Sequence, residues 1–477
     1  MDQNQFETVI GLEVHVQLRT ESKIFCACST EFAQPPNTNV CPVCAGYPGV
    51  LPVLNRAVLA LAVRVASAFG CTVQESIYFE RKNYFYPDLP KNYQISQYKV
   101  PLGKNGGVEL ETGRTICVER VHLEEDAGKL THKEGGSLVD LNRAGTPLLE
   151  IVSMPDIRSP REAFEYLRTL KMILQYIEAS DCDMEKGSLR CDANISLRRR
   201  GEERLGTKVE LKNMNSFRGV RDALTHEQER QKEVLCAGRT VVQETRLWNV
   251  DRQRTESMRT KEEAHDYRYF PDPDLPDFSV PDELIAREAA RVGELPLARK
   301  KRFAERYSLD EGQLEVLVGQ KALGDFFEAA LKYYSQPREI AKWIIGPFLE
   351  QVNALPQGMR GVSISSQNFA KIVQYFSEGK LNNLAAKKVL ATAVLSTQDV
   401  DEIIREQGLE QISGEDELAG YVRDIISEQQ EAVSQYLSGK TQAVMFLVGQ
   451  VMKKTRGNAN PKKVKALFEK ELEKKRS

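Results

Sequence analysis

The chain has 477 residues and a formal net charge of −2, with 41% hydrophobic and 28% charged residues. This length predicts two to four domains, and the composition is typical of a folded globular protein. The nearly balanced charge does not indicate a nucleic-acid or membrane binder, and no apolar run approaches the roughly 18 residues that a membrane span needs. The N-terminal sequence is acidic and polar and unlike a signal peptide, so we expect a cytoplasmic protein without a membrane partner.

The first predicted element is a strand over residues 12–18, which read LEVHVQL. Its Leu and Val residues alternate with Glu13, His15 and Gln17, so the strand has one apolar and one polar face. A single histidine on a strand is usually structural or solvated. Here, however, His15 shares its face with the carboxylate of Glu13.

Four cysteines follow in two close pairs, Cys26 with Cys28 and Cys41 with Cys44. Four thiolates at this spacing suit the tetrahedral coordination of structural zinc. The alternative is four free thiols, whereas a disulfide is disfavoured in a chain without a secretion signal. The spacing therefore predicts a zinc knuckle over residues 26–44.

Residues 80–96 are rich in aromatic, basic and proline side chains and are not expected to form a regular helix. Two interpretations remain open. Such a segment either holds phosphates and stacks on bases, or forms an ordered loop that is packed by its own tyrosines.

Residues 119–152 contain two of the five histidines and a dense set of carboxylates. A predicted strand places His122 and Glu124 on one polar face. Further on, Glu150 lies inside an apolar run, where a carboxylate is costly to bury unless it is paired or binds a metal. The simplest interpretation of Glu150 alone is a salt bridge to Arg120 or Arg143.

A helix is predicted over residues 162–176, with Ser159 and Pro160 at its start. Two more strands follow, over residues 189–197 and 207–212, and each has a polar face that carries acidic and basic side chains. Strands from distant parts of the chain therefore each carry an acidic residue on a polar face. The residues concerned are Glu13, His15, Glu124 or Glu125, Glu150, Asp192 and Glu210.

If these strands share a sheet, their like charges need a cation between them. Carboxylate ligands suit magnesium or manganese, and this predicts a divalent metal site. Basic residues on the same faces, Arg190, Lys208 and Lys212, would suit a triphosphate. Since the chain has no Walker motif, a nucleotide would be held by metal and side chains.

Proline and aspartate dominate residues 271–281, which we interpret as a linker. Beyond them almost every periodic segment is helical, which predicts a helical bundle with a second boundary near residues 408–414. From Lys440 to the end there are eleven Lys or Arg residues and three Glu. Such a run is either a solvated face or a surface for nucleic acid.

Seven blocks of this sequence, in the same order, resemble the B subunits of the glutamyl/aspartyl-tRNA amidotransferases (GatB). They are GLEVHVQL, FYPDLPKNYQISQY, HLEEDAGK, DLNRAGTPLLEIV, GSLRCDANIS, ELKNMNSF and DYRYFPDPDLP. The resemblance covers essentially the whole chain and implies an α+β fold. It implies a cradle domain with a mixed β-sheet and helices (residues 1–292), an all-helical domain (293–407) and a small helical tail domain that contacts tRNA (408–477).

The resemblance also implies an activity. Members of this family convert mischarged Glu-tRNA(Gln) or Asp-tRNA(Asn) to Gln-tRNA(Gln) or Asn-tRNA(Asn). The cradle domain transfers the γ-phosphate of ATP to the side-chain carboxylate of the tRNA-bound amino acid, and ammonia then displaces phosphate. An amidase-type A subunit, the glutaminase, supplies the ammonia, and a small C subunit joins the other two in a heterotrimer.

The resemblance implies that His15, Glu125 and Glu150 hold the catalytic Mg²⁺. Strict alternation instead puts Glu124 on the face with His122. A strand that ends or bulges at Leu123 would reconcile the two, and we expect Glu125.

Further site residues follow from the resemblance. Glu13, Asp192 and Glu210 are implied as second-metal or channel residues, and the cysteines match the zinc-bearing bacterial form of the family. Two other function classes fit part of the sequence. A zinc-knuckle RNA-binding protein without catalysis would explain the tail and the cysteines, and a metal-dependent phosphohydrolase would explain the carboxylates.

Overall fold

The computed structural model describes residues 5–260, 267–409, 414–455 and 459–475, and these divide into two compact units at Arg299 and Lys300. Within the described residues, the first unit is built on a sheet of nine strands in the order β14-β13-β12-β11-β1-β10-β7-β6-β2. The strands are β1 (Phe6–Gln17), β2 (Thr72–Val73), β6 (Gly103–Glu109), β7 (Thr115–Glu125), β10 (Pro147–Ser153), β11 (Leu189–Arg199), β12 (Val209–Lys212), β13 (Glu244–Asn249) and β14 (Arg254–Thr260). Neighbouring strands are antiparallel except β12 and β13, which are parallel, so the sheet is mixed as predicted.

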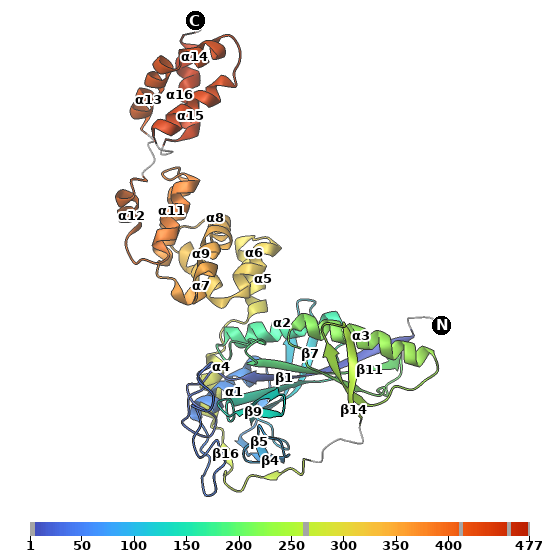
Figure 1. Cartoon of the computed structure of the whole chain (residues 1–477). Helices are drawn as coiled ribbons and strands as arrows, with labels where there is room; N and C mark the ends of the chain where they lie inside the picture. Colours follow the sequence, from blue (N-terminus) through green and yellow to red (C-terminus); the bar gives the residue numbers. More distant parts are fainter. Residues whose placement is uncertain (1–4, 261–266, 410–413, 456–458, 476–477) are drawn as a thin grey trace. The chain divides into compact units, whose positions relative to one another are not determined.

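Helices cover the apolar face of this sheet (Figure 1). They are α1 (Arg56–Ala68), α2 (Pro160–Tyr176) and α3 (Phe217–Cys236), while α4 (Asp282–Ala290) packs against α1. Leu12, Val14 and Val16 of β1 are buried in the same hydrophobic core as residues of α1, α2 and α3. Because side chains alternate along a strand, Glu13 and His15 point to the opposite face. That opposite face is where the predicted site must lie.

The start of α2 confirms the sequence prediction. The side chain of Ser159 accepts a hydrogen bond from the backbone N–H of Glu162, and Pro160 occupies the first turn. This N-cap satisfies a backbone donor that the helix itself leaves unpaired.

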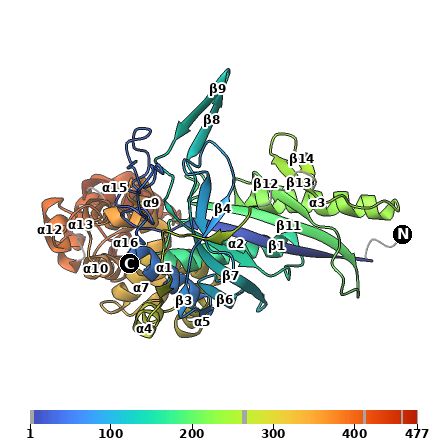
Figure 2. The same ribbon diagram turned by 90° about the horizontal axis from the view of Figure 1, so that it is seen from below.

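Smaller sheets extend the first unit. Strand β4 (Glu80–Asn83) lies between β5 (Tyr93–Ser96) and β15 (Phe270–Pro271), and β3 (Ser76–Ile77) pairs with β16 (Phe278–Ser279). Strands β8 (Lys129–Lys133) and β9 (Gly136–Asp140) form a hairpin that projects from the sheet (Figure 2).

The prediction of a linker over residues 271–281 is wrong. This segment contributes residues to β15 and β16, and Asp272 is buried at 3% exposure with its carboxylate 3.0 Å from Nε of Arg81. The prolines and aspartates that suggested a linker instead form turns and an ion pair that hold the segment against β3 and β4.

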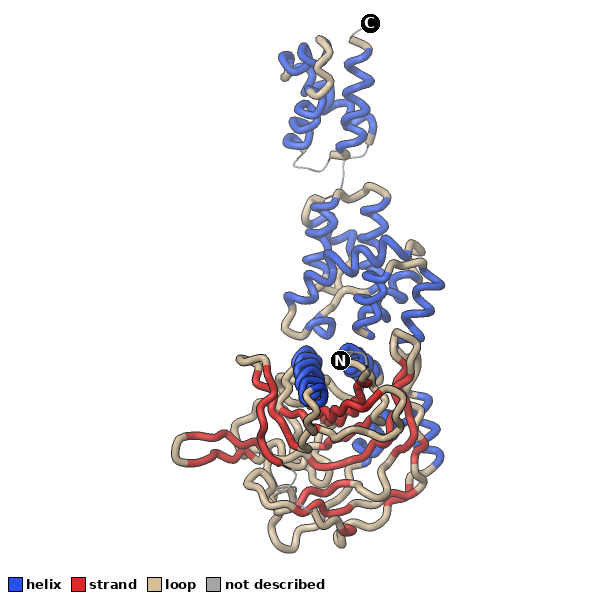
Figure 3. Tube along the Cα trace, turned by 90° about the vertical axis from the view of Figure 1, so that its right-hand side faces the viewer, coloured by secondary structure: helices blue, strands red, loops and turns tan. Residues whose placement is uncertain are grey.

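The second unit, residues 300–477, contains helices and no strand among its described residues (Figure 3). Its helices are α5 (Pro296–Tyr307, which begins in the first unit), α6 (Glu311–Gly319), α7 (Lys321–Leu331), α8 (Pro337–Trp343), α9 (Leu349–Ala354), α10 (Ser366–Ser377), α11 (Asn383–Ala393), α12 (Val400–Glu406), α13 (Glu415–Glu428), α14 (Gln430–Leu437), α15 (Ala443–Lys454) and α16 (Pro461–Glu473). A π-helix (Ile344–Phe348) and a 3₁₀-helix (Gly358–Gly361) flank α9.

Helices α13 to α16 have a hydrophobic core of their own, which includes Leu418, Leu447 and Phe468. The α+β fold class is confirmed. The domain boundaries at 292/293 and 407/408 stay predictions. Among the described residues, no helix is long and apolar enough to cross a membrane.

Candidate active site and metal-binding residues

The register of the central sheet brings the predicted polar residues onto one face. Strand β1 lies between β10 and β11, so that His15 is opposite Glu150 and Glu13 is opposite Asp192. On the other side of β10, Glu150 is opposite His122 of β7. Residues more than a hundred positions apart in the sequence therefore become neighbours.

Three of these side chains form a compact group whose ligand atoms all lie within 4.8 Å of one another: His15, Glu124 and Glu150. Nε2 of His15 is 3.6 Å from Oε1 of Glu124 and 3.4 Å from Oε2 of Glu150. His122 supports the group from the side, with its Nε2 at 3.2 Å from the same oxygen of Glu150. One imidazole and two carboxylates are a donor set that fits Mg²⁺ or Mn²⁺.

The electrostatics of this group are unusual for a sheet surface. Burial by itself would lower the pKa of His15, but its hydrogen bond with Glu150 and the surrounding carboxylates raise that pKa to about 9. Burial opposes ionisation of Glu150 as well, yet the charge of His122 holds its pKa well below the usual value. Burial, together with the charges of Glu150 and Asp192, raises the pKa of Glu13. The site thus concentrates negative charge that a divalent cation would neutralise.

Glu125 lies outside this group, contrary to the expectation. Strand β7 pairs regularly with β10 as far as Glu125, so it neither ends nor bulges at Leu123, and consecutive side chains point to opposite faces. The carboxylate oxygens of Glu125 lie 2.5 and 2.6 Å from Nζ of Lys91, and Oε2 also accepts a hydrogen bond from the backbone N–H of Ile95. Glu125 borders a separate cavity of about 240 Å³, which Cys26 and Lys91 also line. The geometry therefore supports the strict alternation, with Glu124 beside His15.

A cavity of about 330 Å³ opens over the group. Its lining comprises Glu13, His15, Lys82, Ser96, Gln97, Tyr98, Arg120, His122, Glu124, Glu150, Asp192, Glu210, Lys212, Tyr267 and Tyr269. Of the residues expected for a second metal or a channel, Glu13, Asp192 and Glu210 all line it. Only Lys212 of the three basic residues expected to hold a nucleotide does so.

The other two basic residues have different surroundings. The guanidinium of Arg190 binds both carboxylate oxygens of the buried Asp126, at 2.8 and 3.1 Å. Lys208 is exposed and precedes the first residue of β12, so it does not line the cavity. Lys212 does line it, forms an ion pair with Asp192, and lies 3.1 Å from Glu210.

Sequence patterns alone missed several lining residues, notably Gln97, and considered Arg120 only as a salt-bridge partner of Glu150. The structure pairs Glu150 with His15 and His122 instead. The aromatic segment over residues 80–96 was the available signal. Lys82 and Ser96 from its two strands reach the cavity, and Nζ of Lys82 lies 4.9 Å from the ring centroid of Tyr267. Residues 80–96 are therefore an ordered part of the fold, in line with the interpretation as an ordered segment, and some of them also line the cavity.

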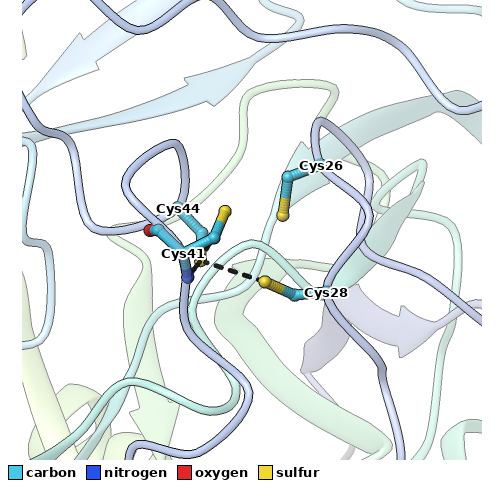
Figure 4. A group of neighbouring side chains, drawn as sticks. All are labelled: Cys26, Cys28, Cys41 and Cys44. Carbon is cyan, nitrogen blue, oxygen red and sulfur yellow. Dashed lines mark hydrogen bonds between the residues drawn. The ribbon is translucent and has the colours of Figure 1, made fainter.

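The four cysteines predicted to bind zinc come together as well (Figure 4). Sγ of Cys44 lies 3.9 Å from Sγ of Cys28 and 3.9 Å from Sγ of Cys41. A tetrahedral zinc with Zn–S bonds of about 2.3 Å separates its sulfurs by about 3.8 Å, so the observed spacing fits zinc and is far too long for a disulfide. The backbone N–H of Cys41 also donates to Sγ of Cys44 at 3.2 Å, as is common around metal-bound thiolates.

A metal-binding loop must be held in place, and neighbouring segments do this for the knuckle. Nζ of Lys23, which is fully buried, donates to the carbonyl of Asn39 at 2.7 Å and lies 3.5 Å from Sγ of Cys44. The side chain of Asn142 accepts from the backbone of Asn39 at 2.8 Å. The residues present therefore fit a structural metal.

Comparisons with known proteins place the chain in a family. A family model described as the GatB/GatE catalytic domain matches residues 8–286, and one described as the GatB domain matches residues 325–472. The B subunit of the aspartyl/glutamyl-tRNA(Asn/Gln) amidotransferase of Carboxydothermus hydrogenoformans is 50% identical over 478 residues, covering 98% of this chain and 99% of that protein. Proteins of the same name from Thermoanaerobacter pseudethanolicus (48% identical; 98% and 100% covered) and Brevibacillus brevis (47% identical; 98% and 99% covered) are also similar. Two family models that together span most of the chain, and identities near one half over its full length, show that the chain belongs to the GatB family.

Proposed function

We propose that this chain is the B subunit of an ATP-dependent aminoacyl-tRNA amidotransferase. It converts Glu-tRNA(Gln), Asp-tRNA(Asn) or both to the correctly amidated Gln-tRNA(Gln) and Asn-tRNA(Asn). The group of His15, Glu124 and Glu150 at the floor of an acidic cavity carries this proposal, together with the full-length similarity to proteins named for that reaction.

The chemistry has a clear requirement. A carboxylate is a poor acylating agent because its leaving group would be oxide. Transfer of the γ-phosphate of ATP to a carboxylate oxygen, with ADP leaving, turns that oxygen into part of a good leaving group. Ammonia then attacks the carbonyl carbon and loses protons, and inorganic phosphate leaves as the amide forms.

The difficult step joins two anions, so charge neutralisation and positioning dominate its catalysis. His15, Glu124 and Glu150 would hold Mg²⁺. When bound, the metal would neutralise negative charge on the reacting groups. Lys212 adds a fixed positive charge at the cavity wall, because Asp192 and Glu210 overcome the effect of burial and raise its pKa. The aromatic rings of Tyr98 and Tyr269 stack at a centroid distance of 4.3 Å, and both residues line the cavity.

The remaining assignments follow the same proposal. Glu13, Asp192 and Glu210 are second-metal or channel residues, and the cysteine knuckle holds structural Zn²⁺. A glutaminase (the A subunit) and a small third protein (the C subunit) complete the assembly, and residues 408–477 contact tRNA. The name of the relatives, which describes each of them as one lettered component of an amidotransferase, supports an assembly of several chains.

The rival function of a zinc-knuckle RNA-binding protein is weaker. It would explain the cysteines and the basic tail, but it leaves the group of His15 with the buried Glu124 and Glu150 without a purpose. Removing charged groups from water is costly, and a fold that only bound RNA would gain nothing from it.

The test is an amidation assay with the chain purified together with the partner subunits that accompany it. Mischarged tRNA, ATP, Mg²⁺ and either glutamine or free ammonia are supplied, and Gln-tRNA or Asn-tRNA is measured. ATP consumption that depends on mischarged tRNA supports the proposal. Tight tRNA binding without any amidation would favour the RNA-binding alternative, and ATP hydrolysis without tRNA would favour a phosphohydrolase.

A further inference from the structure

Three buried polar atoms on the cavity wall have no hydrogen-bond partner among the described residues. They are Nε2 of Gln97, Nε of Arg120 and Nδ1 of His122. A native fold pairs almost all of its buried polar groups, and an unpaired donor costs about 1–3 kcal/mol. Three such atoms along one cavity indicate groups that bind a substrate.

Gln97 is the most constrained of the three. It is only 1% exposed, and its Oε1 accepts a hydrogen bond from the backbone N–H of Leu123 at 2.9 Å. That bond fixes which end of the amide is oxygen, since a flipped amide would place two donors together. The NH₂ end is therefore a buried donor without a partner among the described residues, on a side chain that lines the cavity.

Arg120 lies two residues before His122 on β7, so the two Cα atoms are about 7 Å apart along the strand. The other long basic side chains of the cavity are engaged, Lys212 by Asp192 and Glu210 and Lys82 by the ring of Tyr267. Arg120 forms no ion pair with any described residue, although five carboxylates line the same cavity.

The chemistry of an anion-binding pair follows from these donors. A guanidinium offers a planar fork of N–H groups that matches the oxygens of a phosphate or a carboxylate. The amide of Gln97 adds a neutral donor whose direction is set by the backbone of β7. Both residues line the cavity, and neither of these two donor atoms has a partner among the described residues, so both can pair with an anion that enters it.

We propose that Arg120 and Gln97 form a substrate-binding pair that contacts the anionic oxygens of a reacting group. This inference rests on the proposed function. The anion is either a phosphate of ATP or the side-chain carboxylate carried by tRNA, since both must enter the cavity. Both are groups of anionic oxygens. Removing the pair would weaken the binding of ATP in the first case and of mischarged tRNA in the second.

The experiment uses the complex with its partner subunits and replaces Arg120 by Met or by Lys. Amidation with free ammonia is measured while ATP and mischarged tRNA are varied separately. Loss of a charge-assisted contact raises KM by roughly 10- to 100-fold for the substrate that Arg120 touches. Arg120→Lys recovers part of this loss because it restores the charge without the planar fork. Arg168→Met is the matched control, because Arg168 lies on α2 outside the cavity, where its guanidinium pairs with the exposed Glu111.

A second variant tests Gln97. Gln97→Glu keeps an oxygen that accepts from Leu123 but replaces the donor by a second oxygen, so it raises KM for the same substrate as Arg120→Met. Thermal unfolding of each variant separates a folding defect from lost binding. A rise in the KM of ATP identifies the phosphate, and a rise in the KM of tRNA identifies the carboxylate.

Unchanged kcat and KM for both substrates in folded Arg120→Met and Gln97→Glu overturn the pair. Failure of the wild-type complex to amidate any mischarged tRNA overturns the proposed function instead.

Discussion

Replacement of Glu150 by Gln is the sharpest test of the metal group, because Gln keeps the size of the side chain and removes its charge. Oε2 of Glu150 lies 3.4 Å from Nε2 of His15 and 3.2 Å from Nε2 of His122, so one oxygen serves two imidazoles. Burial lowers the pKa of His15, but the hydrogen bond and charge of Glu150, together with other carboxylates, raise it to about 9, so Glu150 strongly favours positive charge at this position. A carboxylate that exerts such a field on an imidazole exerts at least a comparable one on a dication.

Glu150→Gln should therefore lower the rate of amidation by about 10²-fold or more, equivalent to ~2.7 kcal/mol of transition-state stabilisation. Binding of tRNA should change little, since the proposed tRNA contacts lie in residues 408–477. The assay supplies free ammonia in place of glutamine, so that the glutaminase partner is bypassed. Exposed Glu119 lies on β7 outside the cavity, and Glu119→Gln is the control that should retain wild-type rates.

A Glu150→Gln variant that amidates at the wild-type rate would refute this reasoning. Glu150 would then be a structural carboxylate that is held by two histidines, and the divalent metal would have to bind elsewhere.

Four further predictions follow from other parts of the chain. Glu124→Gln should reduce free-ammonia amidation and bound Mg²⁺ or Mn²⁺ together, and equal metal binding in this variant and the wild type would return Glu125 to consideration. Cys41→Ser should lower zinc content and thermal stability together, and elemental analysis that finds no zinc in active wild-type protein would contradict the knuckle. Deletion of residues 414–477 should weaken tRNA binding and flatten its salt dependence because phosphate contacts are lost, while unchanged affinity would mean that the tail is only a solvated face. Glu288 is fully buried, and its Oε2 lies 2.7 Å from a guanidinium nitrogen of Arg64. Burial would raise the pKa of Glu288, but the hydrogen bond from Arg64 lowers it. The ionised carboxylate therefore stabilises the fold above the unfolded pKa near 4.5, and this stabilisation is lost as the pH falls through the lowered pKa of the folded state. Glu288→Gln should cost about 1–3 kcal/mol at pH 7, because the largely buried Arg64 loses its ion-pair partner, and the free energy of unfolding of the variant should depend less steeply on acid; an identical acid transition in chemical denaturation would disprove the assignment.

The amino-acid sequence alone determined the local features of this protein. Alternation of apolar and polar residues in β1 and β11 defined which side chains leave the core, because a strand places successive side chains on opposite faces. The Ser159–Pro160 pair predicted the start of α2. The spacing of the four cysteines predicted that their thiols come together, as tetrahedral zinc requires. Motif resemblance then indicated the family and the function, and the family was confirmed.

Only the tertiary structure decided which polar residues meet. Strand order and register join His15, Glu124 and Glu150 across three strands, and no local pattern records a pairing between positions so far apart. The regular pairing of β7 with β10 also puts consecutive side chains on opposite faces. Glu124 therefore lies in the acidic cavity, whereas Glu125 pairs with Lys91.

The structure also decided two matters that composition misrepresented. Arg190 has the charge expected of a phosphate ligand, but the buried carboxylate of Asp126 already engages it. The segment around Asp272 has the composition of a linker, yet its backbone pairs with β3 and β4, and the adjoining Tyr267 and Tyr269 become part of the cavity wall. Composition describes what a segment prefers in isolation, whereas long-range strand pairing and ion pairing set where it lies in the folded chain.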